Sequence, residues 1–103
     1  MAKFTLTASP TFTSKVSIPV PGSKAVPVEF KFKGRTKDEF KKFLETMTDH
    51  EDLHVVLEMA SGWDLEDVFN EDNVEKLLQN YIGSGRAIIE KYINELSAAR
   101  LGN

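Results

Sequence analysis

The sequence predicts an α+β fold that is predominantly helical, with an N-terminal β-hairpin or extended segment followed by a compact bundle of about four helices. Apolar and polar residues alternate over residues 1–34, whereas apolar residues recur at helical spacing over residues 35–103. A chain of 103 residues can bury one hydrophobic core but not two independent ones. We therefore expect a single domain that spans residues 1–103.

The first third of the chain carries the predicted strands. Phe4 and Leu6 alternate with polar residues, which indicates a half-buried strand at the start. Alternation returns over residues 16–20 and 26–32, and the turn residues between them predict a hairpin. Pro27 cannot donate a ladder hydrogen bond, so the second hairpin strand is expected to be edge-like there. An isolated hairpin is marginally stable, so its Val/Phe face should pack on the helices or on a second subunit.

Two amphipathic helices are predicted next. Thr36 and Glu39 form a capping-box pattern, which places the start of the first helix. The second helix is expected to begin near Asp49 or Asp52 and to end near Gly62. The apolar stripes, spaced i, i+3, i+4 and i+7, consist of Phe40, Phe43, Leu44 and Met47 in the first helix and Leu53, Val56, Leu57 and Ala60 in the second.

Two further helices complete the predicted bundle. The third is expected to begin after a cap at Asn70 or Asp72. The fourth should start at Ser84 or Gly85 and run to about Arg100. Their stripes consist of Val74, Leu77, Leu78 and Tyr81 in the third helix and Ile88, Ile89, Tyr92, Ile93, Leu96 and Ala99 in the fourth.

Charge is distributed unevenly along the chain. Residues 1–42 contain nine basic and three acidic residues, whereas residues 43–103 contain four basic and thirteen acidic ones. This asymmetry favours either attraction between the two parts of one domain or head-to-tail self-association. The basic residues lie on no recognition helix, so nucleic-acid binding is not expected. The absence of cysteine fits a reducing cytoplasm, and no apolar run approaches the roughly 20 residues of a membrane span.

One motif is typical of an enzyme. His50, Glu51 and His54 match the H-E-x-x-H pattern of zinc peptidases, in which the histidines bind zinc and the glutamate acts as general base. The chain has no other histidine, so a third ligand would be a carboxylate such as Glu58, one turn away and poorly placed for tetrahedral coordination. We treat a zinc peptidase as a remote alternative and expect no enzyme, metal or cofactor.

A set of residues in the second half of the chain carries a resemblance to a known family. The set consists of Gly62, Trp63, Asp64, Phe69, Asn73, Leu77, Leu78 and Tyr81, followed by the apolar run over residues 88–96. With the extended segment before it, this pattern resembles the tail assembly chaperones of long-tailed, lambda-like non-contractile bacteriophages over roughly residues 28–100. Such proteins often have a proline after the tyrosine, where this chain has Ile82 and Gly83.

The resemblance implies a protein that binds the phage tape measure protein, a long helical chain, and keeps it soluble during tail assembly. It also implies self-association, and a longer form, made by ribosomal frameshifting, that recruits the tail tube protein. Such a chaperone acts in the cytoplasm of the host cell and is absent from the mature virion. The alternative is a small structural virion protein, such as a tail-completion or connector subunit.

The candidates for a partner or subunit interface are seven apolar side chains, Phe30, Phe32, Trp63, Phe69, Tyr81, Ile89 and Ile93. Each can instead complete the core, which is the commoner place for a lone tryptophan beside a glycine that ends a helix. Burying one such side chain contributes about 1.5–3 kcal/mol, so any that stay exposed would mark the interface. Asp64 is expected to be structural, as the cap of a short turn over residues 65–68.

Overall fold

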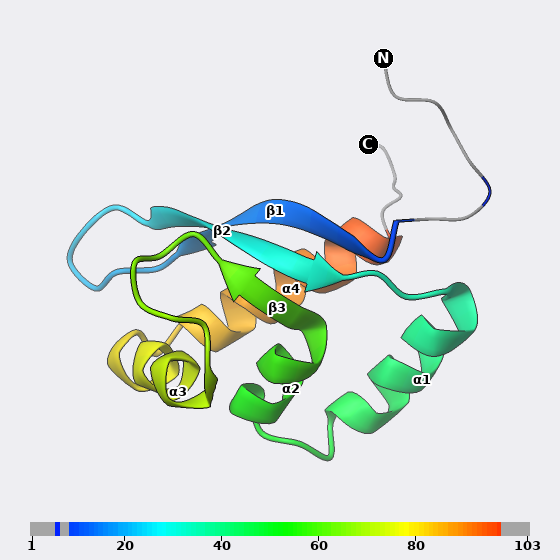
Figure 1. Ribbon diagram of the computed structural model, residues 1–103. Coiled ribbons are helices and arrows are strands. Elements are labelled where there is room, and N and C mark those ends of the chain that lie inside the picture. Colours follow the sequence, from blue (N-terminus) through cyan, green and yellow to red (C-terminus); the bar gives the residue numbers. More distant parts are fainter. Residues whose placement is uncertain (1–5, 7–8, 98–103) are drawn as a thin grey trace.

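The computed structural model describes residue 6 and residues 9–97, which form two layers (Figure 1). A three-stranded antiparallel sheet of order β1-β2-β3 makes one layer, and four helices on one side of it make the other. This arrangement confirms the predicted α+β class. The elements are β1 (Thr11–Ile18), β2 (Val26–Lys33), α1 (Lys37–Met47), α2 (Asp52–Met59), β3 (Ala60–Trp63), α3 (Glu71–Asn80) and α4 (Ser84–Ser97).

The hairpin of β1 and β2 is longer than the sequence indicated. β1 begins at Thr11, and the two strands pair without a break from Thr11 opposite Lys33 to Ile18 opposite Val26. The loop between them turns at Gly22, whose positive φ of 76° favours glycine. The strand expected around Phe4 lies outside the described residues.

β3 was not predicted, because Ala60 continues the apolar stripe of the helix before it. α2 ends at Met59 instead, and Ala60 is already extended, with φ −125° and ψ 152°. β3 then pairs with β2, placing Trp63 opposite Phe30, with a register shift between Lys31 and Phe32. The ring of Trp63 meets that of Phe30 edge-on at 5.9 Å, a cross-strand aromatic contact that favours this pairing.

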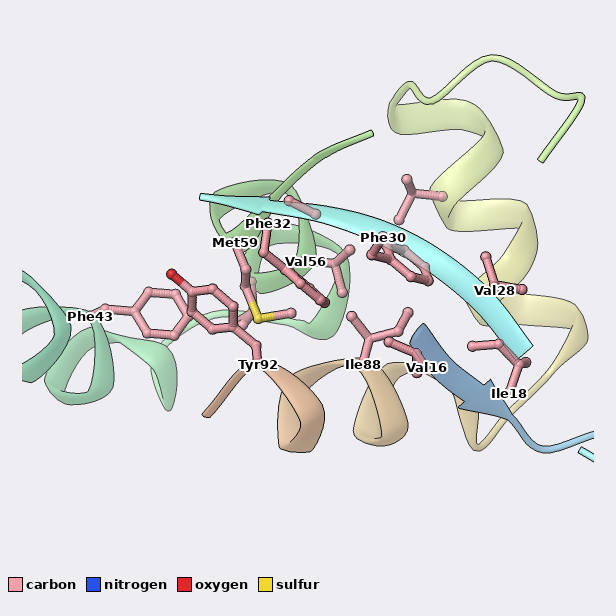
Figure 2. Close-up of a cluster of buried hydrophobic side chains, with 13 residues drawn as sticks. Val16, Ile18, Val28, Phe30, Phe32, Phe43, Val56, Met59, Ile88 and Tyr92 are labelled. Atoms are coloured by element: carbon pink, nitrogen blue, oxygen red, sulfur yellow. The ribbon is translucent and has the colours of Figure 1, made fainter. Parts of the chain in front are cut away.

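The core lies between the sheet and the helices (Figure 2). Phe30 and Phe32 point from β2 toward α2 and α4, and both are 0% exposed. The expectation that these two residues face a partner is therefore wrong for this fold, since the helices already cover the Val/Phe face of the hairpin. The other large, fully buried side chains are Val16, Val56, Met59, Val74, Ser84, Ile88 and Tyr92.

Local capping defines where the helices begin. The Thr36 hydroxyl accepts from Glu39 N–H at 3.2 Å, and the Glu39 carboxylate accepts from Thr36 N–H at 2.8 Å, so α1 has a complete capping box. The Asn70 side chain caps α3 by accepting from Asn73 N–H at 2.8 Å. α2 differs from expectation, because its cap residue is Glu51 and the side chain forms no capping hydrogen bond.

A polar cluster around Tyr92 ties α1 to the rest of the molecule. The Tyr92 hydroxyl donates to the Lys33 carbonyl at 2.7 Å and accepts from Arg35 Nη1 at 3.0 Å. Arg35 Nη2 donates to the Glu58 carbonyl at 3.2 Å, and its guanidinium lies 4.6 Å from the centre of the Phe43 ring. The cluster thus joins β2, α1, α2 and α4 at the point where the chain passes from β2 to α1.

No helix within residues 9–97 is both long enough and apolar enough to cross a bilayer.

Candidate functional site

An open groove of about 630 Å³ lies between the hairpin end of the sheet and α3. Figure 1 shows the β1–β2 loop and α3 at the same end of the molecule. Apolar side chains from three places line the groove: Ile18, Val26 and Val28 from the hairpin, Trp63 and Leu65 from β3 and the segment after it, and Leu77 and Tyr81 from α3 and its end.

The groove exists because the apolar face of the hairpin extends beyond its helical cover. Val26 and Val28 lie two residues apart on β2, so their side chains point to the same face of the sheet. Val28 is 5% exposed, whereas Val26 is 49% exposed. The helical layer therefore ends between these two residues and leaves Val26 exposed to solvent.

One wall of the groove is the segment of residues 64–69, which three contacts fasten. Trp63 Nε1 donates to the Asp67 carbonyl at 2.7 Å, and the Phe69 ring packs edge-on against the Trp63 ring at 5.0 Å. Asn73 Nδ2 donates to the Val68 carbonyl at 2.7 Å. These contacts fix the path of an otherwise irregular segment and hold Leu65 at the groove.

Asp64 anchors the start of this wall, but not as the sequence predicted. Residues 65–68 form no helical turn, so Asp64 is not a helix cap. Its N–H donates to the Glu29 carbonyl at 3.0 Å, and its Oδ1 accepts from Glu29 N–H at 3.0 Å. Asp64 thus continues the pairing of β3 with β2 by one further position.

The wall and the start of α3 carry concentrated negative charge. Residues 64–75 contain six acidic residues and no Lys or Arg, namely Asp64, Glu66, Asp67, Glu71, Asp72 and Glu75. None of them takes part in the ion pairs found among the described residues, which join Arg35 to Glu58, Arg86 to Glu90 and Lys91 to Glu95. We call residues 64–75 the acidic rim; of its six carboxylates only that of Asp67 lines the groove, and Lys76, the next residue along α3, lines it too.

The structure brings together some of the predicted interface residues and separates others. Trp63 and Tyr81 line the groove, and Phe69 supports Trp63. Ile89 and Ile93 are half-buried on α4 and do not line it.

Sequence reasoning did not single out the other apolar residues of the groove, among them the exposed Val26 and Leu65. Leu65 could have been recognised as an exposed apolar residue, because it stands between charged residues of an irregular segment. The sequence around Val26 gave no sign of its exposure, which depends on where α3 lies.

The histidine motif does not form the arrangement of a zinc peptidase. His50 precedes α2, so the two histidines do not share one helix. The rings of His50 and His54 stack with their centres 4.9 Å apart. Within the part of the chain that the structure describes, no three acidic, histidine or cysteine side chains are grouped to hold a metal ion.

These features define a small α+β module with an open apolar groove and an acidic rim. The chain belongs to the phage tail assembly chaperone family, whose model matches residues 1–103, the whole sequence. No curated protein and no solved structure gives a match. The family match confirms the resemblance that the pattern from Gly62 to Tyr81 indicated.

Proposed function

We propose that this tail assembly chaperone binds the phage tape measure protein and keeps it soluble until the tail tube encloses it, without catalysing a reaction. The observation that carries the proposal is the open apolar groove in a member of this family. Leu65 and Tyr81 are each 37% exposed, so both, like Val26, retain surface to bury against a partner. Apolar side chains gathered in a groove are a common mark of a protein-binding surface.

The groove suits binding that is reversible at each site. Its exposed side chains are already partly covered, so each adds less than the roughly 1.5–3 kcal/mol of full burial. After the costs of association, we expect a dissociation constant near micromolar, or about −8 kcal/mol for each site. Several chaperones on one long tape measure protein would act together, yet tail tube subunits could still displace them one at a time.

We also propose that the chaperone self-associates head to tail. The basic part of the chain, residues 1–42, includes the hairpin and the first half of α1, whereas the acidic remainder includes the second half of α1 together with α2, α3 and α4. Exposed Lys15 and Lys31 lie on strands whose outer face no helix covers in Figure 1. If this basic face contacted the acidic residues 64–75 of a second copy, the opposite charges of the two surfaces would attract and partly neutralise each other. Light scattering after size-exclusion chromatography should show oligomers that dissociate at high salt; a monomer at every salt concentration contradicts self-association.

The family supports a further proposal about where the protein acts. We place it in the cytoplasm of the host cell during tail assembly, together with a longer frameshifted form that recruits the tail tube protein, and not in the mature virion. A tail-completion or connector subunit would remain in the particle. Mass spectrometry of purified virions distinguishes the two, because peptides of this chain at structural copy number would contradict the chaperone assignment.

The central test is co-expression with fragments of the tape measure protein of the same phage. The wild-type chain should keep a fragment in solution and co-purify with it. Val26→Asp and Leu65→Asp each place a charge in the groove and should weaken binding by about tenfold or more, which corresponds to roughly 1.4 kcal/mol. A suitable control is Ile82→Asp, because Ile82 is 88% exposed and does not line the groove. Co-purification of no fragment would overturn the proposal.

A further inference from the structure

The groove borders an edge of β2 that is closed to an additional strand. Gly34 N–H donates to the Pro10 carbonyl on the β1 side at 2.8 Å, and Asp64 N–H donates to the Glu29 carbonyl on the β3 side at 3.0 Å. Backbone groups of successive strand residues face opposite neighbours, so Glu29 and Pro27 both face the β3 side. Asp64 already forms hydrogen bonds with both the N–H and the carbonyl of Glu29, and Pro27 has no N–H to donate. From Pro27 to Glu29, β2 therefore offers this side no free backbone donor.

This closed edge decides which backbone conformation fits the groove. If a partner in extended conformation lay beside β2, its carbonyl groups would find no N–H donor on that strand. Backbone groups that are buried without a hydrogen-bond partner destabilise a complex. An α-helix satisfies its backbone hydrogen bonds internally and can dock through side chains alone. The apolar residues of the groove, Val26, Leu65, Leu77 and Tyr81, supply the surface that such docking needs.

The acidic rim indicates which charge the partner carries. In the described part of the chain, Lys76 of α3 is the one basic residue that lines the groove, whereas Asp67 lines it from the wall and Glu66 is exposed next to Asp67. Their carboxylates take no part in the ion pairs found among residues 9–97. A partner with Lys or Arg along this side would gain favourable contacts, whereas an acidic partner would be repelled.

Resting on the proposed function, we infer that the tape measure segment held in this groove is an amphipathic α-helix with a basic flank. Its apolar residues, spaced i, i+3 or i+4 and i+7, would contact Val26, Leu65 and Tyr81. Its Lys or Arg residues would lie beside Glu66 and Asp67. The tape measure protein is expected to be helical as a whole, and the inference adds which face of a helix docks, with what spacing and with what charge on its flank.

Overlapping peptides from the tape measure protein of the same phage provide the probe for conformation. Each would have about 20 residues, or roughly 30 Å as a helix. The binding peptides, labelled with ¹³C at successive positions, should show helical carbonyl and Cα chemical shifts in complex with the full chain. Extended shifts together with nuclear Overhauser contacts to Pro27 and Glu29 would overturn the inference while leaving the proposed function intact.

Charge reversal tests the basic flank with a matched control. Asp67 is the acidic residue of the rim that lines the groove, so Asp67→Lys should weaken the affinity by about threefold to tenfold, on the scale of one exposed ion pair replaced by repulsion. Glu71→Lys makes the same change in charge on α3, at a position that does not line the groove, and should change the affinity less than about twofold. Equal effects of the two variants, or no effect of either, would overturn the basic flank.

The remaining outcomes separate the inference from the function on which it rests. Peptides that bind with unchanged affinity to Val26→Asp would dock elsewhere, which overturns the inference and leaves tape measure binding standing. If no peptide and no longer fragment binds the wild-type chain, the proposed function and the inference both fail.

Discussion

Asp64 and Glu29 are joined by two hydrogen bonds that close a ring between the end of β3 and the middle of β2. The backbone N–H of Asp64 donates to the Glu29 carbonyl, while the Asp64 side chain takes the place of a backbone acceptor for Glu29 N–H, both at 3.0 Å. If the position of Asp64 held an ordinary strand residue, β3 would continue along β2. Asp64 instead completes the last pair and lets the chain turn away to form the groove wall.

Replacing Asp64 by alanine should lower the free energy of unfolding by about 1 kcal/mol, because Glu29 N–H loses its acceptor at a site that water can partly reach. Asp64→Asn keeps an oxygen in the same place and should cost less. Urea denaturation of the three proteins measures the difference. Equal loss in both variants would show that the negative charge, and not the hydrogen bond, stabilises this junction.

A second prediction concerns the close approach of α2 to the start of α4 at Gly85. A Cβ at Gly85 would clash with Asp52 Oδ2 and would lie 3.2 Å from Asp52 Cβ, so rotation of the short Asp52 side chain cannot relieve the crowding. Gly85→Ala should therefore destabilise the protein by about 1–3 kcal/mol, even though alanine favours a helix more than glycine does.

The double variant with Asp52→Ala tests that explanation. Removing the Asp52 carboxylate eliminates the closest contact, so Asp52→Ala with Gly85→Ala should be more stable than Gly85→Ala alone. Thermal unfolding of the two single variants and the double variant gives the coupling free energy. Additive effects would mean that Gly85 is required for a reason other than its contact with Asp52.

The fold class was predictable from the sequence because periodicity reflects which side of an element faces the core. Alternation in the hairpin and helical spacing after Thr36 each correspond to an observed element. β3 escaped prediction, because four residues are too few for a period to appear and Ala60 fits both α2 and a strand. Pairing with Phe30 across the sheet, a contact between distant parts of the chain, decided its conformation.

The groove could be predicted only in part, for a related reason. Trp63 and Tyr81 were singled out as apolar residues near helix ends, and both line it. Phe30 and Phe32 have the same character, yet they are buried, because α2 and α4 cover the middle of the hairpin and not its end. Composition identifies an apolar side chain, but the extent of the neighbouring layer determines whether it stays exposed.

The third prediction concerns pH. Burial raises the pKa of Tyr92 above its ordinary value of 10.0, because the phenolate is poorly solvated, although Arg35 opposes the shift. The folded protein thus favours the neutral phenol, so Tyr92 stabilises it fully below pH 10 and less as the pH rises through the higher folded pKa. The free energy of unfolding of the wild type should fall more steeply above pH 10 than that of Tyr92→Phe.

At neutral pH, Tyr92→Phe should itself cost about 1–3 kcal/mol, since the Lys33 carbonyl and Arg35 both lose a partner. Tyr81→Phe is the matched control, because Tyr81 lies at the groove and is partly exposed, and it should cost less than about 0.5 kcal/mol. Guanidinium denaturation at neutral pH and again above pH 10 measures both effects. If the free energy of unfolding fell with the same slope above pH 10 in the wild type and in Tyr92→Phe, the role of Tyr92 in the pH dependence would be contradicted.

The last prediction uses Trp63 as a reporter of the groove. It is the one tryptophan in the sequence, it lines the groove, and its indole N–H is held by the Asp67 carbonyl. A tape measure segment docked against Val26 and Leu65 would exclude water from the indole ring. Its emission should then move to shorter wavelength, and acrylamide should quench it less. The same titration with Val26→Asp should leave emission and quenching unchanged at concentrations that saturate the wild type. A complex detected by light scattering without any change in Trp63 emission would place the partner on another surface.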